Sequence, residues 1–183
     1  MINRRSFLFG STAAATLSTL AACRTMGKPV VSRVQALAGA GLSQPLEIVD
    51  DVYGVPHIRA QTIPDAFFGQ GYVVARDRMF QIDLAHRREL GRLAEAFGPE
   101  FAEHDGAARL FHYGGDLDAE LARIPAHILA CARAYADGIN ARIDEILADP
   151  ALLPLEYSIL GTTPLKWTLR DFVLARGIPG GNV

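Results

Sequence analysis

The stretch GYVVARDRMFQIDLAHRRELGRLAEAF, residues 71–97, carries the pattern on which the expected fold depends. Its apolar or ring-bearing residues recur at spacings of three and four: Met79, Ile82, His86, Leu90, Leu93 and Phe97. Residues at such spacings lie on one face of an α-helix and can pack against a core. We therefore predict a long amphipathic helix that Gly98 and Pro99 bring to an end.

A second amphipathic helix is predicted farther along the chain. Six residues again recur at spacings of three and four: Ile128, Cys131, Tyr135, Ile139, Ile143 and Ile146. Asp149 and Pro150 end this pattern, since proline cannot continue a helix. Gly138 lies inside it, where glycine costs about 1 kcal/mol relative to alanine. The missing side chain suits close packing of a neighbouring helix.

The residues before the first helix predict a β-hairpin. Branched residues at 46–49 favour one strand, and residues 55–60 favour a returning strand. Between them, Asp51 and Gly54 suit the first and fourth positions of a type I turn. The expected fold class is therefore α+β, mainly helical, with an N-terminal β-hairpin.

The start of the first helix is also marked in the sequence. Pro64 and Asp65 are typical of a first helical turn, where proline needs no amide partner and a carboxylate complements the helix dipole. Gly69 and Gly71 weaken the residues that follow. We expect a short helix over 66–72 and then a break or a kink.

Composition excludes several classes of protein. The chain has 183 residues, of which 50% are hydrophobic, and this suits a single domain with a real core. A formal charge of −2 argues against a nucleic-acid partner, because such proteins concentrate basic charge. Cys23 and Cys131 are too few for a disulfide framework, and no Cys/His spacing typical of zinc is present.

The amino terminus is expected to be an export signal. Arg4 and Arg5 precede an uncharged stretch of small and apolar residues over 7–22, which is shorter than the ~20 residues that span a bilayer. The arginine pair resembles a twin-arginine signal, and Leu-Ala-Ala before Cys23 resembles a lipobox whose cysteine is acylated. The blander alternatives are ordinary n-region charge and an ordinary small residue near a cleavage site.

These features divide the chain into three expected parts. Residues 1–22 form the signal peptide, 23–44 a tether rich in small residues, and 45–183 the folded part. The expected location is outside the cytoplasm, either periplasmic or anchored to a membrane through Cys23. No other contact with a membrane is expected.

A search for catalytic motifs in the sequence gives mostly negative results. None of the serines lies in a G-x-S-x-G motif, and no histidine pair forms H-E-x-x-H. The acidic residues Asp116, Asp118 and Glu120 lack the glycine and glutamate positions of an EF-hand, and they are interpreted as an exposed helix start. We therefore predict no catalytic residue and no metal ligand in this chain.

The remaining candidates also favour structural roles. His86 lies on the apolar helix face, and His57 lies beside the predicted turn, so both are expected to pack or to form hydrogen bonds. The basic run Arg87, Arg88 and Arg92 is interpreted as an ion-pair network rather than a phosphate site. Its expected acidic partners are Asp83, Glu89 and Glu95.

Several ordered blocks resemble the start of the α subunit of the penicillin acylase (penicillin amidase) family. The blocks are DVYGVPHI at 51–58, DAF at 65–67, GYVVARDRMFQID at 71–83, RRELGRLAE at 87–95, AYADGIN at 134–140, and EY at 156–157 leading to PLKWT at 164–168. The resemblance covers about residues 46–171 and is looser at 106–115.

This resemblance implies an N-terminal nucleophile hydrolase with an αββα fold, made from an exported precursor that cuts itself into two chains. The nucleophile of such enzymes is the first serine of the β chain, whose own α-amine acts as the base. The nucleophile, the oxyanion donors and the calcium ligands of the family would all lie beyond Val183. No catalytic role and no cofactor is therefore assigned within this chain.

Two functional interpretations remain open. In the first, the chain is the amino-terminal part of an exported amidohydrolase that cleaves a linear amide, and its partners are a β chain and a small acyl-amide substrate. In the second, it is a truncated, non-catalytic product or a docking piece for a separate β chain. Family substrates include penicillins, glutaryl cephalosporins and acyl homoserine lactones, and the sequence does not choose among them.

Overall fold

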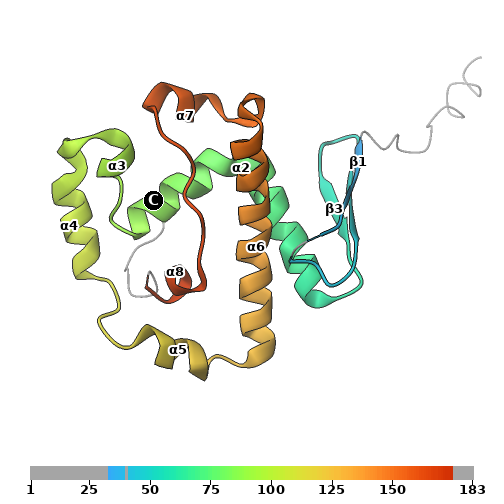
Figure 1. Ribbon diagram of the computed structural model, residues 1–183, viewed down its shortest axis with the longest axis horizontal. Coiled ribbons are helices and arrows are strands. Elements are labelled where there is room, and N and C mark those ends of the chain that lie inside the picture. The colour runs from blue at the N-terminus through green and yellow to red at the C-terminus, as the bar shows by residue number, and fades with distance from the viewer. Residues whose placement is uncertain (1–32, 40, 175–183) are drawn as a thin grey trace, which may run out of the picture.

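The computed structural model describes residues 33–39 and 41–174 (Figure 1). Arg4, Arg5 and Cys23 lie outside the described residues. A small antiparallel sheet lies at one end of the molecule, and helices form the rest. The helical elements are α2 (Ile63–Glu89), α3 (Ala94–Phe97), η2 (Pro99–Phe101), α4 (Ala102–Leu110), α5 (Leu117–Arg123), α6 (Ala126–Ala148), η3 (Pro150–Leu152), α7 (Leu155–Leu160) and α8 (Leu169–Leu174).

The sheet contains the predicted hairpin and one strand that was not predicted. Strands β2 (Leu46–Asp50) and β3 (Pro56–Arg59) pair antiparallel, as expected. Strand β1 (Arg33–Leu37) pairs with the other edge of β2. The expectation of a tether is therefore wrong for residues 33–37. Most of β1 is exposed, so backbone pairing with the free edge of β2, rather than a buried apolar pattern, accounts for this strand.

Helix α2 begins where the sequence predicted and runs farther than expected before its first irregularity. Thr62 is the N-cap and its hydroxyl accepts a hydrogen bond from the Asp65 amide. The expected kink after residues 66–72 is present, but it lies farther along the chain than predicted, and Gly69 and Gly71 are within regular helix. The departure from helical geometry comes at Arg78, where φ is −140° and ψ is 31°.

The predicted continuation of this helix to Phe97 is also wrong. Helix α2 ends at Glu89, and Gly91 then turns the chain with a φ of +60°, a conformation that glycine adopts without strain. A Cβ on Gly91 would lie 2.6 Å from the Asp105 carbonyl oxygen. Leu93 is nevertheless buried and Phe97 is half-buried. The periodic pattern therefore predicted correctly that these residues face the core, but it did not predict that the helix ends before them.

The centre of the molecule is the crossing of α2 with α6, where two glycines bring the backbones into contact. A Cβ on Gly71 would lie 2.1 Å from the Tyr135 carbonyl oxygen, and one on Gly138 would lie 2.0 Å from the Phe68 carbonyl oxygen. The expected role of Gly138 in close helix packing is confirmed. Gly71, which was expected to weaken a helix, has the same role in the facing helix.

Two apolar clusters lie along this crossing. One joins the sheet to both helices and contains Leu46, Ile48, Phe68, Tyr72, Val73 and Ala134. The other joins both helices to α7 and contains Ala75, Met79, Ile139, Ile143, Ile146 and Tyr157. The second predicted helix is thus confirmed as α6, with Ile139, Ile143 and Ile146 in the core. Arg76 adds a polar connection, because its guanidinium binds both carboxylate oxygens of Asp50 at the end of β2.

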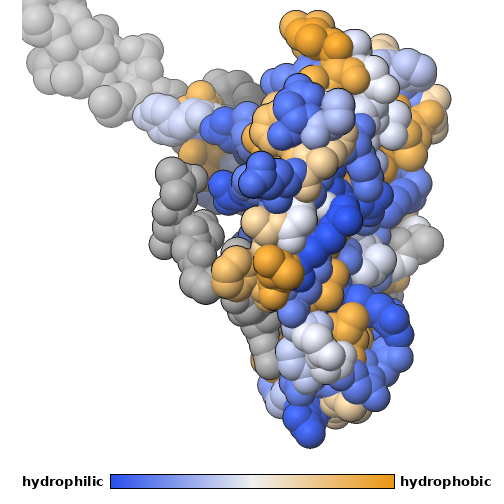
Figure 2. Space-filling view, turned by 90° about the vertical axis from the view of Figure 1, so that its left-hand side faces the viewer, coloured by the Kyte–Doolittle hydropathy of each residue, from blue (hydrophilic) through white to orange (hydrophobic). Residues whose placement is uncertain are grey.

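The elements α3, η2, α4 and α5 follow one another in an arc on the left-hand side of Figure 1. Buried Asp105 fixes the start of this arc by accepting hydrogen bonds from the amides of Leu93 and Ala94, both at 2.8 Å. Figure 2 shows this side as mainly polar, with apolar groups at several points, including the top, where α7 lies in Figure 1. Among the described residues, no helix is both long and apolar enough to cross a membrane.

The crossing can be tested with Gly138→Ala. We expect the free energy of unfolding to fall by about 3 kcal/mol, which is the upper end of the usual cost of overpacking a core. The cost is high because the added Cβ meets a backbone carbonyl oxygen, which cannot rotate away. Urea denaturation followed by circular dichroism measures the difference.

Gly106→Ala is the matched control for this prediction. Gly106 is an exposed residue of α4 whose added Cβ would meet no atom within 4 Å, so alanine should stabilise the protein by up to about 1 kcal/mol. Equal effects of the two substitutions would contradict the proposed role of Gly138 in the close crossing.

Candidate functional site

The main polar site in the interior holds an extended segment, residues 162–168, which we call the strap. The strap joins α7 to α8, crosses α2 and runs beside α6 in Figure 1. The residue before the strap is Gly161, which ends α7 in the left-handed conformation with a φ of +65°. An extended segment cannot satisfy its own backbone groups, so its partners must come from neighbouring side chains.

Asp83 and Arg87 of α2 hold the first half of the strap. The two side chains are each about 3% exposed, and Arg87 Nε donates to Asp83 Oδ2 at 2.9 Å. Asp83 Oδ1 accepts from the Leu165 amide at 2.9 Å, and Arg87 donates to the Thr163 carbonyl oxygen at 2.7 Å. A buried ion pair is favourable only when its remaining bonding positions are filled. The strap backbone fills them here.

Asn140 of α6 holds the second half. Its Oδ1 accepts from the Trp167 amide and its Nδ2 donates to the Trp167 carbonyl oxygen, both at 2.8 Å. The side-chain amide thus forms the same two bonds that a neighbouring β-strand would form. Lys166 adds an exposed ion pair with Asp144.

The Trp167 ring is covered by His86. The two rings stack with centroids 4.2 Å apart and an interplanar angle of 24°. His86 is 2% exposed, and its Nε2 lies 3.3 Å from Asp171 Oδ2 in α8. Burial raises the pKa of Asp171, but contacts with His86 and the Thr168 amide outweigh it and leave that pKa below its usual value. The structural role predicted for His86 is confirmed.

Tyr157 closes the site from α7. It is 1% exposed, and burial together with the nearby Asp83 carboxylate raises the pKa of its hydroxyl. The hydroxyl faces Asp83 without a hydrogen bond of regular geometry among the described residues. A phenol with a raised pKa stays protonated at neutral pH, so Tyr157 acts as a packing residue and not as a base.

The predicted ion-pair network is confirmed in part. Arg87 lies 3.7 Å from Glu95 as well as contacting Asp83, and Arg92 Nε donates to Glu95 at 2.6 Å. Within residues 33–39 and 41–174, no ion pair joins Arg88 to Glu89. These contacts use the basic groups internally, and none converges on a shared cavity.

The other two predicted structural roles are also confirmed. His57 Nε2 lies 3.2 Å from Asp51 Oδ2 beside the hairpin turn. Asp116 caps α5, and its carboxylate accepts from the amides of Asp118 and Ala119. Across the part of the chain that the structure describes, no group of three or more His, Cys, Asp or Glu side chains is placed to hold a metal ion.

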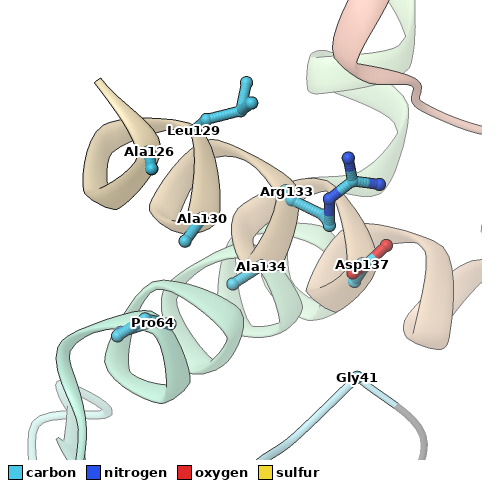
Figure 3. Close-up of a pocket in the computed structure, with 8 residues that line it drawn as sticks. All are labelled: Gly41, Pro64, Ala126, Leu129, Ala130, Arg133, Ala134 and Asp137. Atoms are coloured by element: carbon cyan, nitrogen blue, oxygen red, sulfur yellow. The ribbon is translucent and has the colours of Figure 1, made fainter. Parts of the chain in front are cut away.

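Two shallow hollows lie side by side between α6, the start of α2 and the loop at Gly41. One has a volume of about 320 Å³, and Figure 3 shows Ala130 and Ala134 pointing from α6 toward the turn that carries Pro64. The other has a volume of about 510 Å³ and shares Gly41 and Asp137 with the first. No serine, cysteine or histidine is among the described residues lining either hollow.

The polar groups at the larger hollow are also engaged with each other. The Tyr72 hydroxyl donates to Glu145 at 2.8 Å and accepts from Gln35 at 2.7 Å. Burial, followed by the Glu145 contact, raises the pKa of Tyr72. Among the described residues, the polar groups of the strap site and of the larger hollow bond to one another and to the strap backbone, so their geometry supports positioning of the strap.

The roles of Asp83 and Asn140 were missed from the sequence. Asp83 was read only as one member of an ion-pair network, although it lies four residues before Arg87 on the helix face that packs. Asn140 directly follows the core residue Ile139, which was the available signal for a polar residue at a packed face. Their partners in the strap come from distant sequence, and no local pattern identifies them.

Comparisons with known proteins match most of this chain. The sequence profile of the family described as penicillin amidase matches residues 45–179. A penicillin G acylase of Escherichia coli is 38% identical over 133 residues, which are 72% of this chain and 16% of that protein. A penicillin acylase 2 proenzyme of a Pseudomonas species is 39% identical over 132 residues.

A third relative is an acyl-homoserine lactone acylase of Pseudomonas fluorescens. It is 32% identical over 171 residues, covering 91% of this chain and 20% of that protein. Among solved structures, a thermostable penicillin G acylase of Alcaligenes faecalis matches with a TM-score of 0.66 and 33% identity, covering 72% of this chain and 70% of that one. The chain therefore spans 16–20% of the length of these curated relatives.

The strap can be tested with Asn140→Ala, which removes both bonds to the Trp167 backbone. We expect the free energy of unfolding to fall by about 1–3 kcal/mol, because a partly buried backbone donor and acceptor lose their partners. Trp167 is the only tryptophan, so its fluorescence reports the strap directly and should shift to longer wavelength.

Lys166→Ala is the control. It removes the exposed pair with Asp144 and a long bond to the Asn140 carbonyl oxygen, but neither bond of the Asn140 side chain, and it should cost about 1 kcal/mol or less. If Asn140→Ala left both the emission of Trp167 and the unfolding midpoint unchanged, Asn140 would not be holding the strap.

Proposed function

This chain belongs to the penicillin amidase family, and on that premise we propose that it forms the amino-terminal part of an exported amidohydrolase that cleaves a linear amide. The matched relatives support an amide-hydrolase activity: two are named for penicillin and one for acyl-homoserine lactones. The bond proposed to be cleaved joins an acyl group to an amine. The identity of both groups remains open between these substrate classes.

We place the reacting groups in a second chain. In the proposed reaction, the hydroxyl of an N-terminal serine attacks the amide carbonyl, its α-amine takes the proton, and the proton leaves with the amine product. Water then hydrolyses the acyl-enzyme and restores the serine. One relative is named a proenzyme, which fits a precursor that is processed into such chains. The complete αββα fold and any calcium site would likewise require residues outside this chain.

The observation that carries this proposal is the strap site. Its buried charges and its amide bind the backbone of the strap and hold the strap and α8 in place. A scaffold of this kind suits a chain whose partner supplies the chemistry. The family profile covers the same elements, from residue 45 to residue 179.

A second candidate function is a non-catalytic piece that docks on a separate chain, or a truncated product. This candidate is supported by the small share of each relative, 16–20% of its length, that the chain matches. The two candidates differ in whether the adjoining coding sequence supplies a functional second chain.

We further propose that the protein is exported to the periplasm or held at a membrane through an acylated Cys23. The support is the sequence alone: Arg4 and Arg5 before an uncharged stretch, and Leu-Ala-Ala before the cysteine.

The activity is tested by producing residues 24–183 alone and together with the reading frame that follows them. Purified preparations are assayed for release of amine from phenylacetyl and long-chain acyl amides. We expect no turnover from the isolated chain and measurable turnover from the pair. Turnover by the isolated chain would contradict the proposal, and an adjoining frame without a processing site would favour the non-catalytic candidate.

The anchor is tested by fractionating cells that express Cys23→Ala in the full chain. We expect the wild-type protein to sediment with membranes and Cys23→Ala to become soluble. Cys131→Ala is the matched control and should behave as the wild type, since Cys131 belongs to α6. Membrane sedimentation of Cys23→Ala would contradict acylation at this residue.

A further inference from the structure

The turn between β2 and β3 presents apolar side chains to solvent. Val52, Tyr53 and Val55 are 47%, 88% and 49% exposed, and together we call them the hairpin tip. Single exposed apolar residues are common on protein surfaces, but three within four positions form a local patch.

Hydrogen bonds within the turn fix the backbone of the tip. Asp51 Oδ1 accepts from the amides of Tyr53 and Val55 at 2.8 and 3.0 Å. The Val55 contact first, and then His57, lower the pKa of Asp51, so its carboxylate stays charged at neutral pH and keeps both bonds. Gly54, with a φ of +76°, completes the turn, and its amide donates to the Asp51 carbonyl oxygen.

Rigidity of this kind lowers the entropy lost when a surface binds. A turn whose backbone is already held in one conformation loses less freedom on association than a mobile loop. Tyrosine is also among the residues that carry most binding energy when a partner buries them. The tip therefore combines an apolar anchor, a fixed backbone and full access from solvent.

From these observations we propose that the hairpin tip is an anchor that docks into an apolar pocket on the remaining polypeptide of the same enzyme. This inference rests on the proposed function. The curated relatives are five to six times longer than the part matched here, since that part is 16–20% of their length. A fold of that size must cover surfaces that this chain leaves open.

The surroundings of the tip fit an interface of ordinary composition. A stable interface buries about 800 Å² on each partner, which is more than three side chains supply, so the contact must extend beyond the tip. β3 is an outer strand of the sheet, and it carries the exposed polar residue His57 next to the tip. Polar side chains around an apolar anchor are typical of such a rim.

The test compares variants of the full chain co-produced with the polypeptide encoded after it. Tyr53→Ser should weaken association with that polypeptide about tenfold or more, measured by titration of the purified chains. Tyr53→Phe should retain association, because it keeps the apolar ring. Neither variant should change the thermal midpoint of the isolated chain, since Tyr53 is 88% exposed.

Leu155→Ser is a matched control that removes a similarly exposed apolar side chain, 70% exposed, from α7. It should leave association unchanged. Equal association of wild type and Tyr53→Ser would overturn the docking role while leaving the proposed function in place. If the wild-type chain itself fails to associate, both the proposed function and this inference fall.

Sedimentation of the isolated chain tests whether a second copy of the same chain covers the hairpin tip instead. A wild-type dimer that Tyr53→Ser converts to a monomer would show that a second copy covers the tip, and this would overturn the proposal. We expect both proteins to sediment as monomers.

Discussion

The contact between the backbones of α2 and α6 is the constraint on which the rest of the structure depends. Gly71 and Gly138 each face a carbonyl oxygen of the opposite helix at a distance that excludes any Cβ. Because the helices touch there, one apolar cluster forms on the sheet side of the crossing and another on the α7 side. The sheet and the strap are thereby attached to the same pair of helices.

In this protein, buried charged side chains hold the strap in its position. Asp83 and Arg87 neutralise each other, and the strap backbone takes the bonding positions that remain. Such an arrangement costs desolvation energy and contributes little net stability, but it admits only one placement of the strap. Asn140 also bonds the strap backbone, through its uncharged side-chain amide. Together they fix where α8 begins, and this suits a chain that shapes a site whose reacting groups lie elsewhere.

The sequence predicted the main elements because their signals are local. The N-terminal proline and acid of α2, the turn at Asp51 and Gly54, and the isoleucine spacing of α6 all act within a few residues. The same reasoning failed where glycine has two uses. Gly71 was interpreted only as a residue that weakens a helix, whereas its missing side chain allows a contact with a helix some sixty residues away.

Other errors have the same origin. β1 exists because β2 has a free edge, a property of the assembled sheet and not of residues 33–37. Asp83 bonds a residue 82 positions away, and Asn140 bonds one 27 positions away, so neither role has a local signature. The family resemblance rested on several ordered blocks of sequence, and it was confirmed without any single residue that identified a site.

In our proposal, this chain is a scaffold and the reacting groups lie in another chain. The most direct test is covalent labelling of a preparation that contains both chains and is active. Phenylmethylsulfonyl fluoride modifies an activated serine, and peptide mass mapping then locates the adduct. The account predicts loss of activity with an adduct on a serine outside residues 1–183. An inactivating adduct on a serine of this chain, such as Ser43 or Ser158, would contradict it.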